Sequence, residues 1–170
     1  MTNKQLWLFC DGATGALEAP PLVAGSRTAW RKYFQGESGC AAAAVARNGR
    51  GQIVGWRWRR LPVVSNNEAE YAALLLGMEV ATELQAPEVY CVMDSEIVIG
   101  QMSGHFAVHS HHLRPLHWQA CAAVRKLPSV HFCLIPREWN RLADGLAGQT
   151  LMPWHDLCKA ITAFNREAFV

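Results

Sequence analysis

Short apolar runs and longer amphipathic segments alternate along the chain, and their order predicts an α/β fold. Apolar runs typical of strands lie at residues 4–10, 40–47, 52–61, 89–93 and 130–135. Helical patterns lie at 65–86, 95–103, 113–126, 140–148 and 154–164, with one short helix expected near 26–34. Three strands precede the first long helix, and helices separate the later strands. We therefore expect a five-stranded mixed sheet, with three antiparallel strands followed by parallel ones, and helices on both faces.

Two local patterns predict particular structures. The turn at residues 48–51 contains Asn-Gly between two apolar runs, which is typical of a β-hairpin. In the second run, Trp56 and Trp58 fall on one face of the strand and the intervening arginines on the other. Ser65 and Glu68 have the spacing of a capping box, which predicts the start of the long helix.

The length and composition favour one compact domain. The chain has 170 residues, of which 51% are hydrophobic and 18% charged, so a full core is available. Residues 14–38 are rich in Gly, Ala and Pro, show no period, and are long for a connection inside a domain. We expect one domain over residues 1–149 with 14–38 as an insertion, and a helical extension over 150–170 packed on that domain.

The charge and the cysteine content limit the classes of protein to which this chain can belong. Sixteen Lys and Arg against fourteen Asp and Glu leave a formal charge of +2, which excludes a uniformly basic nucleic-acid binder but allows a local basic face. Six cysteines without a C-x-x-C pair are expected to be reduced, mostly buried thiols of a cytoplasmic protein. No apolar run approaches the ~20 residues of a membrane span.

Four carboxylates fall where the predicted elements end or begin: Asp11 and Asp94 after strands, and Glu70 and Asp144 in the first turns of helices. The carboxyl ends of neighbouring parallel strands form the crevice in which α/β sheets bind ligands. Oxygen ligands alone select Mg²⁺ or Mn²⁺, and two such ions can hydrolyse a phosphodiester. The alternatives are a turn at Asp11 and a helix cap at Asp94. No such structural role is available for Glu70, because Glu68 is already the glutamate of the capping box.

Four segments in order carry a resemblance to a known family. They are the segments 9–13 (FCDGA), 66–71 (NNEAEY), 93–96 (MDSE) and 135–147 (IPREWNRLADGLA). Together they resemble the ribonuclease HI family, and most closely its compact bacterial and archaeal branch with a P-R-E-x-N-x-x-A-D motif. The resemblance covers residues 5–13 and about 38–149.

The resemblance implies an endonuclease that hydrolyses the RNA strand of RNA/DNA hybrids and leaves 5′-phosphate and 3′-hydroxyl ends. It implies two Mg²⁺ ions, with Mn²⁺ as a substitute, held by four catalytic carboxylates: Asp11, Glu70, Asp94 and Asp144. Gly12, Asn66 and Asn67 would contact the hybrid, the amides through the RNA 2′-hydroxyl; the alternative role of the asparagines is to cap the helix. We expect a monomer that binds the hybrid, no membrane and no obligate protein partner.

Two other functions stay open at this point. One is a catalytically weak or inactive domain that only binds hybrids. The other is a DNA nuclease of the integrase type with the same fold. A comparison of hybrid, double-stranded DNA and double-stranded RNA as substrates distinguishes them from the ribonuclease.

The chain departs from the family pattern at three places, the first of which is residues 14–38, which replace a short turn that the family has after its first aspartate. Leu134 stands at the spacing of the family's catalytic-loop histidine, and Arg137 is the nearest loop side chain. Arg137 is therefore a candidate for positioning the scissile phosphate or for assisting product release, although it cannot shuttle protons as histidine does. The family's basic protrusion is replaced by a segment with His105, His109, His111, His112 and His117. This segment is expected to face solvent or phosphate, and the alternative is a metal held by His105 and His109.

Overall fold

The structure is a computed structural model that describes residues 5–16, 38–62, 64–137, 139 and 154–167. Its elements follow the chain as β1 (Gln5–Ala16), β2 (Ser38–Asn48), β3 (Ile53–Leu61), α2 (Asn66–Glu83), β4 (Glu88–Met93), α3 (Glu96–Met102), α4 (Leu113–Val124), β5 (Val130–Leu134) and α6 (Trp154–Glu167). The five predicted strands are all present, and so are the predicted helices that fall on described residues. The helices expected at 26–34 and 140–148 lie outside those residues.

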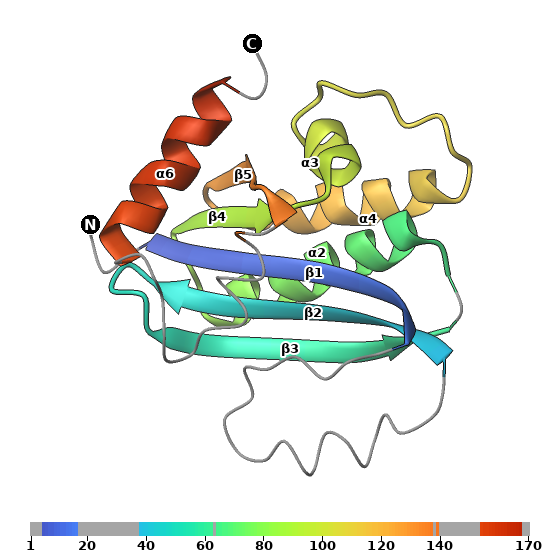
Figure 1. The fold of residues 1–170 in the computed structure, drawn as a ribbon, viewed down its shortest axis with the longest axis horizontal. Coiled ribbons are helices and arrows are strands. Elements are labelled where there is room, and N and C mark those ends of the chain that lie inside the picture. Colours follow the sequence, from blue (N-terminus) through green and yellow to red (C-terminus); the bar gives the residue numbers. More distant parts are fainter. Residues whose placement is uncertain (1–4, 17–37, 63, 138, 140–153, 168–170) are drawn as a thin grey trace.

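One five-stranded sheet forms the centre of the molecule, with the strand order β3-β2-β1-β4-β5. β1, β2 and β3 pair antiparallel, whereas β4 and β5 run parallel to β1. Figure 1 shows α2 and α4 on one side of this sheet and α6 on the other. The predicted fold class is therefore confirmed. Its consequence for the site is that β1 and β4 are parallel neighbours whose carboxyl ends lie at the same edge.

The predicted end of the first strand at Asp11-Gly12 is wrong, because β1 continues to Ala16. Two different partners explain the difference. Pairing of β1 with β4 ends at Phe9, opposite Val92, but pairing with β2 continues to Ala16, opposite Ser38. Asp11 is thus an interior residue of an antiparallel ladder and lies just beyond the end of the parallel one. The strands also extend into both ends of the predicted insertion 14–38.

The predicted hairpin between β2 and β3 is confirmed, but its turn is longer than a two-residue Asn-Gly turn. The side-chain oxygen of Asn48 accepts hydrogen bonds from the backbone N–H groups of Arg50 and Gln52, at 2.9 and 3.1 Å. The left-handed conformation is adopted by Gly51, with φ of 80°, and not by Gly49. The side chain of Asn48 therefore closes the loop by replacing backbone partners.

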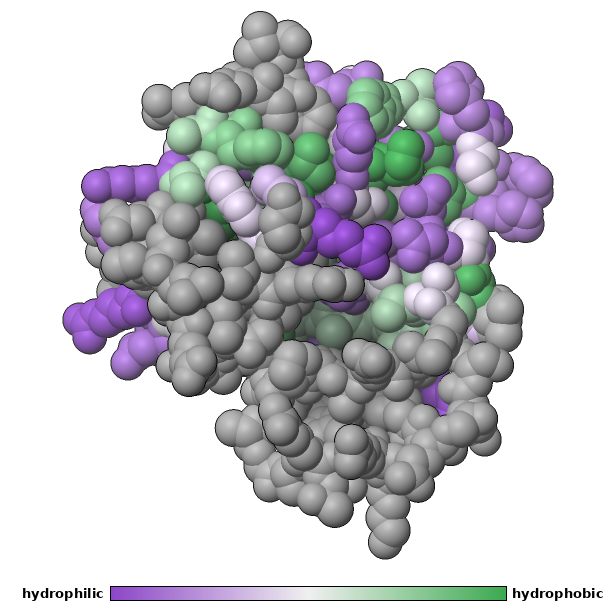
Figure 2. All heavy atoms as spheres, viewed as in Figure 1, coloured by the Kyte–Doolittle hydropathy of each residue, from purple (hydrophilic) through white to green (hydrophobic). Residues whose placement is uncertain are grey.

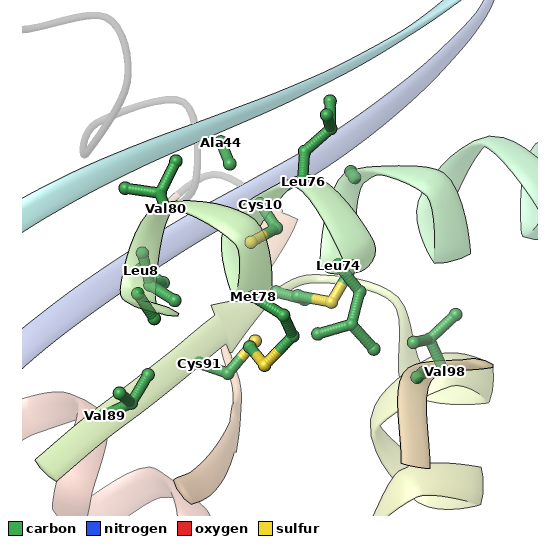
Figure 3. Packing of buried hydrophobic residues seen from close by; sticks show 14 of the residues in the cluster. Leu8, Cys10, Ala44, Leu74, Leu76, Met78, Val80, Val89, Cys91 and Val98 are labelled. Carbon is green, nitrogen blue, oxygen red and sulfur yellow. The ribbon is translucent and has the colours of Figure 1, made fainter. Parts of the chain in front are cut away.

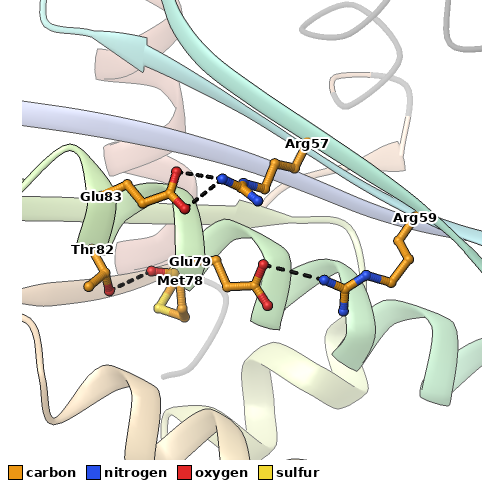
Figure 4. Close-up of polar contacts among 6 residues, drawn as sticks. All are labelled: Arg57, Arg59, Met78, Glu79, Thr82 and Glu83. Carbon is orange, nitrogen blue, oxygen red and sulfur yellow. Dashed lines mark hydrogen bonds and ion pairs between the residues drawn. The ribbon is translucent and has the colours of Figure 1, made fainter.

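The predicted alternation of side chains along β3 is confirmed by ion pairs on one face of the strand. Arg57 contacts both carboxylate oxygens of Glu83 at 2.5 and 2.6 Å, and Arg59 reaches Glu79 at 3.5 Å (Figure 4). Both glutamates lie on α2, so these arginines face α2 and the tryptophans of β3 face the opposite side of the sheet. The pairs are solvent-exposed, so each is worth about 1 kcal/mol or less.

Alternate residues of β1 supply two separate cores. Leu8 and Cys10 point to the α2 side and pack against Leu74 and Met78 of that helix (Figure 3). The smaller core on the other side lies under α6 and contains Trp7, Phe9, Val92, Cys133, Ile135, Cys158 and Ile161. α2 is buried on most sides because it lies between the sheet and α4.

The six cysteines, all of them on described residues, form no disulfide, and every one except Cys121 is buried. Burial raises the pKa of both Cys133 and Cys158 to about 12, so these thiols stay protonated and unreactive at neutral pH. Among the described helices, we find none with the length and hydrophobicity needed to cross a membrane.

Candidate active site

Three of the four predicted carboxylates meet at one edge of the sheet. Asp11 lies on β1, two residues beyond the end of its pairing with β4. Asp94 directly follows β4, and Glu70 lies near the amino end of α2. One carboxylate oxygen from each of the three lies within 4.8 Å of the others. In Figure 2 a strongly hydrophilic patch occupies the middle of the same region, beside the carboxyl end of β4. The fourth predicted carboxylate, Asp144, lies outside the described residues.

Glu70 is held against β1 by the residue that follows Asp11. The backbone N–H of Gly12 donates a hydrogen bond to a carboxylate oxygen of Glu70, at 3.2 Å. A Cβ at position 12 would lie only 2.3 Å from the carbonyl carbon of Ala69 and the nitrogen of Glu70, so no side chain fits between β1 and α2. The absent side chain of Gly12 thus allows the close approach that puts Glu70 beside Asp11. The sequence assigned Gly12 a substrate contact only, and this packing role was missed.

Burial and the neighbouring acids favour the protonated form of Glu70. Burial raises the pKa of Glu70 to about 8, and the negative charges of Asp11 and Asp94 add to the rise. The Gly12 N–H and the positive charge of Arg137 act in the opposite direction. Either a proton or a bound cation can reduce the repulsion between this buried carboxyl and the two neighbouring acids. The donor set consists of carboxylate oxygens alone, which suits a hard divalent ion such as Mg²⁺ or Mn²⁺.

The asparagine pair lies at the amino end of α2, next to the carboxylates. Ser65, and neither asparagine, is the N-cap: its hydroxyl accepts from the Glu68 N–H, and the Glu68 carboxylate accepts from the Ser65 N–H. The Ser65 hydroxyl also donates to the Glu68 carboxylate at 2.6 Å, and this hydrogen bond, together with the one from the Ser65 N–H, lowers the pKa of Glu68. The capping role considered for the asparagines is therefore wrong. Asn66 is exposed, and its side-chain oxygen lies 3.5 Å from the hydroxyl of Thr14 on β1.

Arg137 lies three residues after β5, just beyond the short loop of Ile135 and Pro136, at a position with helical backbone, and its charge lowers the pKa of Glu70. Its side chain is exposed, whereas Leu134 belongs to the strand and cannot act as a loop residue. The start of this loop is held by Asn165 of α6. The Asn165 amide accepts from the Leu134 N–H at 2.6 Å and donates to the Leu134 carbonyl at 2.7 Å, as a neighbouring strand would. No sequence pattern indicated this contact, because the two residues are 31 positions apart.

A family model described as "Reverse transcriptase-like" matches residues 28–150, which include all the motifs after the first strand. The chain belongs to the reverse transcriptase-like family. Its matched region contains Glu70, Asp94 and Asp144, and Asp11 precedes it.

Solved structures similar to this reverse transcriptase-like chain include ribonucleases H. The N-terminal ribonuclease H domain of Rv2228c from Mycobacterium tuberculosis has a TM-score of 0.63 at 26% identity and covers 80% of this chain and 90% of that one. Ribonuclease H1 of the archaeon Halobacterium salinarum has a TM-score of 0.65 at 24% identity and covers 86% of this chain and 97% of that one. The fold is therefore the ribonuclease H fold.

Curated relatives agree with the structural neighbours. Ribonuclease HI of Halobacterium salinarum is 30% identical over 124 residues, which are 70% of this chain and 62% of the relative. The bifunctional protein Rv2228c is 37% identical over 87 residues, or 51% of this chain and 24% of that protein. This chain thus spans about a quarter of the mycobacterial protein and under two thirds of the archaeal enzyme. The predicted likeness to ribonuclease HI is confirmed.

The histidine-rich segment of this reverse transcriptase-like chain is attached to α2 by a buried polar link. Tyr71 donates its hydroxyl hydrogen to the side-chain oxygen of Gln101 at 2.8 Å, and the Gln101 amide donates to the Ala107 carbonyl at 3.3 Å. A Cβ at position 100 would lie 2.3 Å from the ring of Phe106, so that ring covers Gly100 closely. In the part of the chain that the structure describes, the histidines form no group of three or more possible metal ligands.

Proposed function

We propose that this chain is an endonuclease that hydrolyses the RNA strand of RNA/DNA hybrids. The observation that carries the proposal is the convergence of Asp11, Glu70 and Asp94, from three different elements, in a homologue of ribonuclease HI. A ribonuclease H1 of the same fold, 23% identical to this chain, has been solved in complex with an RNA/DNA hybrid, which supports the substrate class.

We propose that the three carboxylates, together with Asp144 as predicted from the sequence, hold two divalent ions. When bound, the ions supply an activated water and stabilise the oxygen that leaves the phosphodiester, which gives 5′-phosphate and 3′-hydroxyl ends. The chain's own contribution is to present these carboxylates as a fixed set. Gly12 holds the Glu70 carboxyl toward Asp11, and Asp94 completes the set from the neighbouring strand. Mg²⁺ is the expected ion, with Mn²⁺ as a substitute.

Three further residues have proposed roles toward the hybrid. Asn66 and Asn67 open α2 next to the carboxylates, and their amides are proposed to bond the RNA 2′-hydroxyl, the group that distinguishes RNA from DNA. The positive charge of Arg137 acts on the carboxyl of Glu70 and lowers its pKa, so Arg137 is suited to hold the scissile phosphate. Guanidinium stays charged at all relevant pH values, and Arg137 therefore orients the phosphate without transferring a proton.

The test is cleavage of a labelled RNA/DNA hybrid with Mg²⁺ and with EDTA, beside double-stranded DNA and double-stranded RNA. We expect Mg²⁺-dependent cleavage of the RNA strand in the hybrid alone. Asp94→Asn should reduce this cleavage by more than about a hundredfold, because an amide is a poor ligand for a hard cation. The matched control is Glu96→Gln, which neutralises an exposed acid two residues away.

Each alternative function predicts a different result in the same assay. Binding of the hybrid without cleavage would indicate that the chain is a domain that binds hybrids and does not cleave them. Cleavage of double-stranded DNA would instead indicate a DNA nuclease of the same fold. Equal cleavage by the Asp94→Asn and Glu96→Gln variants would contradict the assignment of the carboxylates.

A further inference from the structure

The outer face of α4 carries a side chain that the proposed site does not use. Trp118 is 70% exposed, more than any other large hydrophobic residue in the part of the chain that the structure describes. Arg114 lies four residues before it and Arg125 seven residues after it, and both are exposed. Spacings of four and seven put all three on one side of a helix. They form a stripe roughly 16 Å long, with the tryptophan between two arginines.

The stripe belongs to the most acid-poor part of the sequence. Residues 97–137 contain no Asp or Glu, whereas they contain Arg114, Arg125, Lys126, Arg137 and six of the seven histidines. α4 packs against α2, whose Glu79 and Glu83 pair with the arginines of β3. A polyanion that approaches the outer face of α4 therefore meets positive charge and no carboxylate of α4 itself.

One end of the stripe adjoins the candidate active site. His112 is the N-cap of α4, and the ring of His117 in the same helix lies edge-on to the ring of Tyr71, just after the first turn of α2, with ring centroids 6.4 Å apart. That turn carries the asparagines and leads into Glu70. Arg114 follows His112 by two residues, and its guanidinium donates to the Val108 carbonyl at 3.2 Å. α4 extends from this point, so Trp118 and Arg125 lie progressively further from the amino end of α2.

We propose that the α4 stripe, Arg114, Trp118 and Arg125, binds a single strand of nucleic acid that continues from the hybrid held at the carboxylates. This inference rests on the proposed function. An exposed aromatic ring flanked by cations offers a stacking platform for a base and contacts for its phosphates. Bases of a duplex are stacked on one another and present no free face to Trp118, whereas bases of a single strand do. The stripe therefore favours hybrids with a single-stranded extension over blunt ones.

The test compares a labelled blunt hybrid with the same hybrid carrying a single-stranded extension of about ten nucleotides. Binding is followed by fluorescence anisotropy with the full chain carrying Asp94→Asn, in Mg²⁺, so that the substrate stays intact. We expect the extension to tighten binding about tenfold. Trp118→Ala should abolish this gain, whereas Trp118→Phe, which keeps an aromatic face, should retain most of it. Arg125→Gln should lower the slope of log affinity against log salt by about one for the extended hybrid.

Two matched controls separate the stripe from general effects. Leu84→Ala shortens another exposed apolar side chain, at the carboxyl end of α2, and Arg50→Gln removes one positive charge from the β2–β3 turn. Both should keep the roughly tenfold gain. Equal affinity for the two hybrids before mutation, or a gain that survives Trp118→Ala, would overturn the proposal.

Separate assays test the proposed function and the α4 stripe. Cleavage of the blunt hybrid by the chain with its native Asp94 tests the carboxylates alone, because that substrate has no strand to lay on α4. A labelled single strand without hybrid tests the stripe alone. Loss of its binding in Trp118→Ala supports the stripe even if no hybrid is cleaved, and binding unaffected by that substitution counts against the stripe even if every hybrid is cleaved.

Discussion

Glu70→Gln should remove a pH-dependent instability from the metal-free protein. The Glu70 side chain is only 6% exposed, and burial beside Asp11 and Asp94 raises its pKa to about 8. Glutamine has nearly the same shape and carries no charge at any pH, and its side-chain oxygen can still accept from the Gly12 N–H. The substitution therefore removes the cost of ionising this carboxyl while preserving most of its packing.

The sign of the effect follows from the protons that each state binds. Glu70 has a pKa of about 8 in the folded protein and the ordinary value of 4.5 in the unfolded chain. Between these values the folded state binds more protons, so the free energy of unfolding is highest at low pH and decreases as pH rises through the folded pKa. The decrease between pH 5 and pH 8 is on the order of 3 kcal/mol. The variant with glutamine lacks this contribution.

The assay is urea denaturation in EDTA at several pH values from about 5 to 8.5, with the native chain, Glu70→Gln and the control Glu96→Gln. We expect the Glu70→Gln variant and the native protein to differ by about 1 kcal/mol or less at pH 5, and the variant to be more stable by on the order of 3 kcal/mol at pH 8. The control should follow the native curve. Parallel curves for the native chain and Glu70→Gln would refute the reasoning. Added Mg²⁺ should stabilise the native chain and not the variant.

Three further substitutions test how the site is held. Gly12→Ala should cost about 1–3 kcal/mol and reduce the rise in melting temperature on adding Mg²⁺, because the new methyl group pushes β1 and α2 apart. Unchanged stability would show that the two elements have room to separate. Gln101→Leu should cost about 1–3 kcal/mol in urea denaturation, since it leaves the buried Tyr71 hydroxyl without its acceptor, and Tyr71→Phe in the same chain should recover part of that loss. Asn165→Leu should speed hydrogen exchange at the Leu134 amide, because this amide loses its acceptor. Exchange as slow as in the native chain would show that the Asn165 side chain does not protect this amide.

Most of the local structure of the chain could be predicted from residues that are close together in the sequence. The capping box of Ser65 and Glu68 involves residues three apart, and the alternation of Arg57 with its tryptophan neighbours needs only the two-residue period of a strand. Interactions of this kind are complete within a few residues. They are therefore present in the sequence pattern before any tertiary contact forms.

The contacts that shape the site depend on residues distant in the chain, and only the tertiary structure decided them. The end of β1 could not be placed from its own residues, because β2 extends the strand past Asp11 after β4 has stopped pairing. The Gly12–Glu70 contact joins residues 58 apart, and the Asn165–Leu134 pair joins residues 31 apart. A residue's type shows what it can bind, whereas its burial and its neighbours are set by the packing of whole elements. The raised pKa of Glu70 is the clearest case, since it arises from burial and from two acids that other parts of the chain supply.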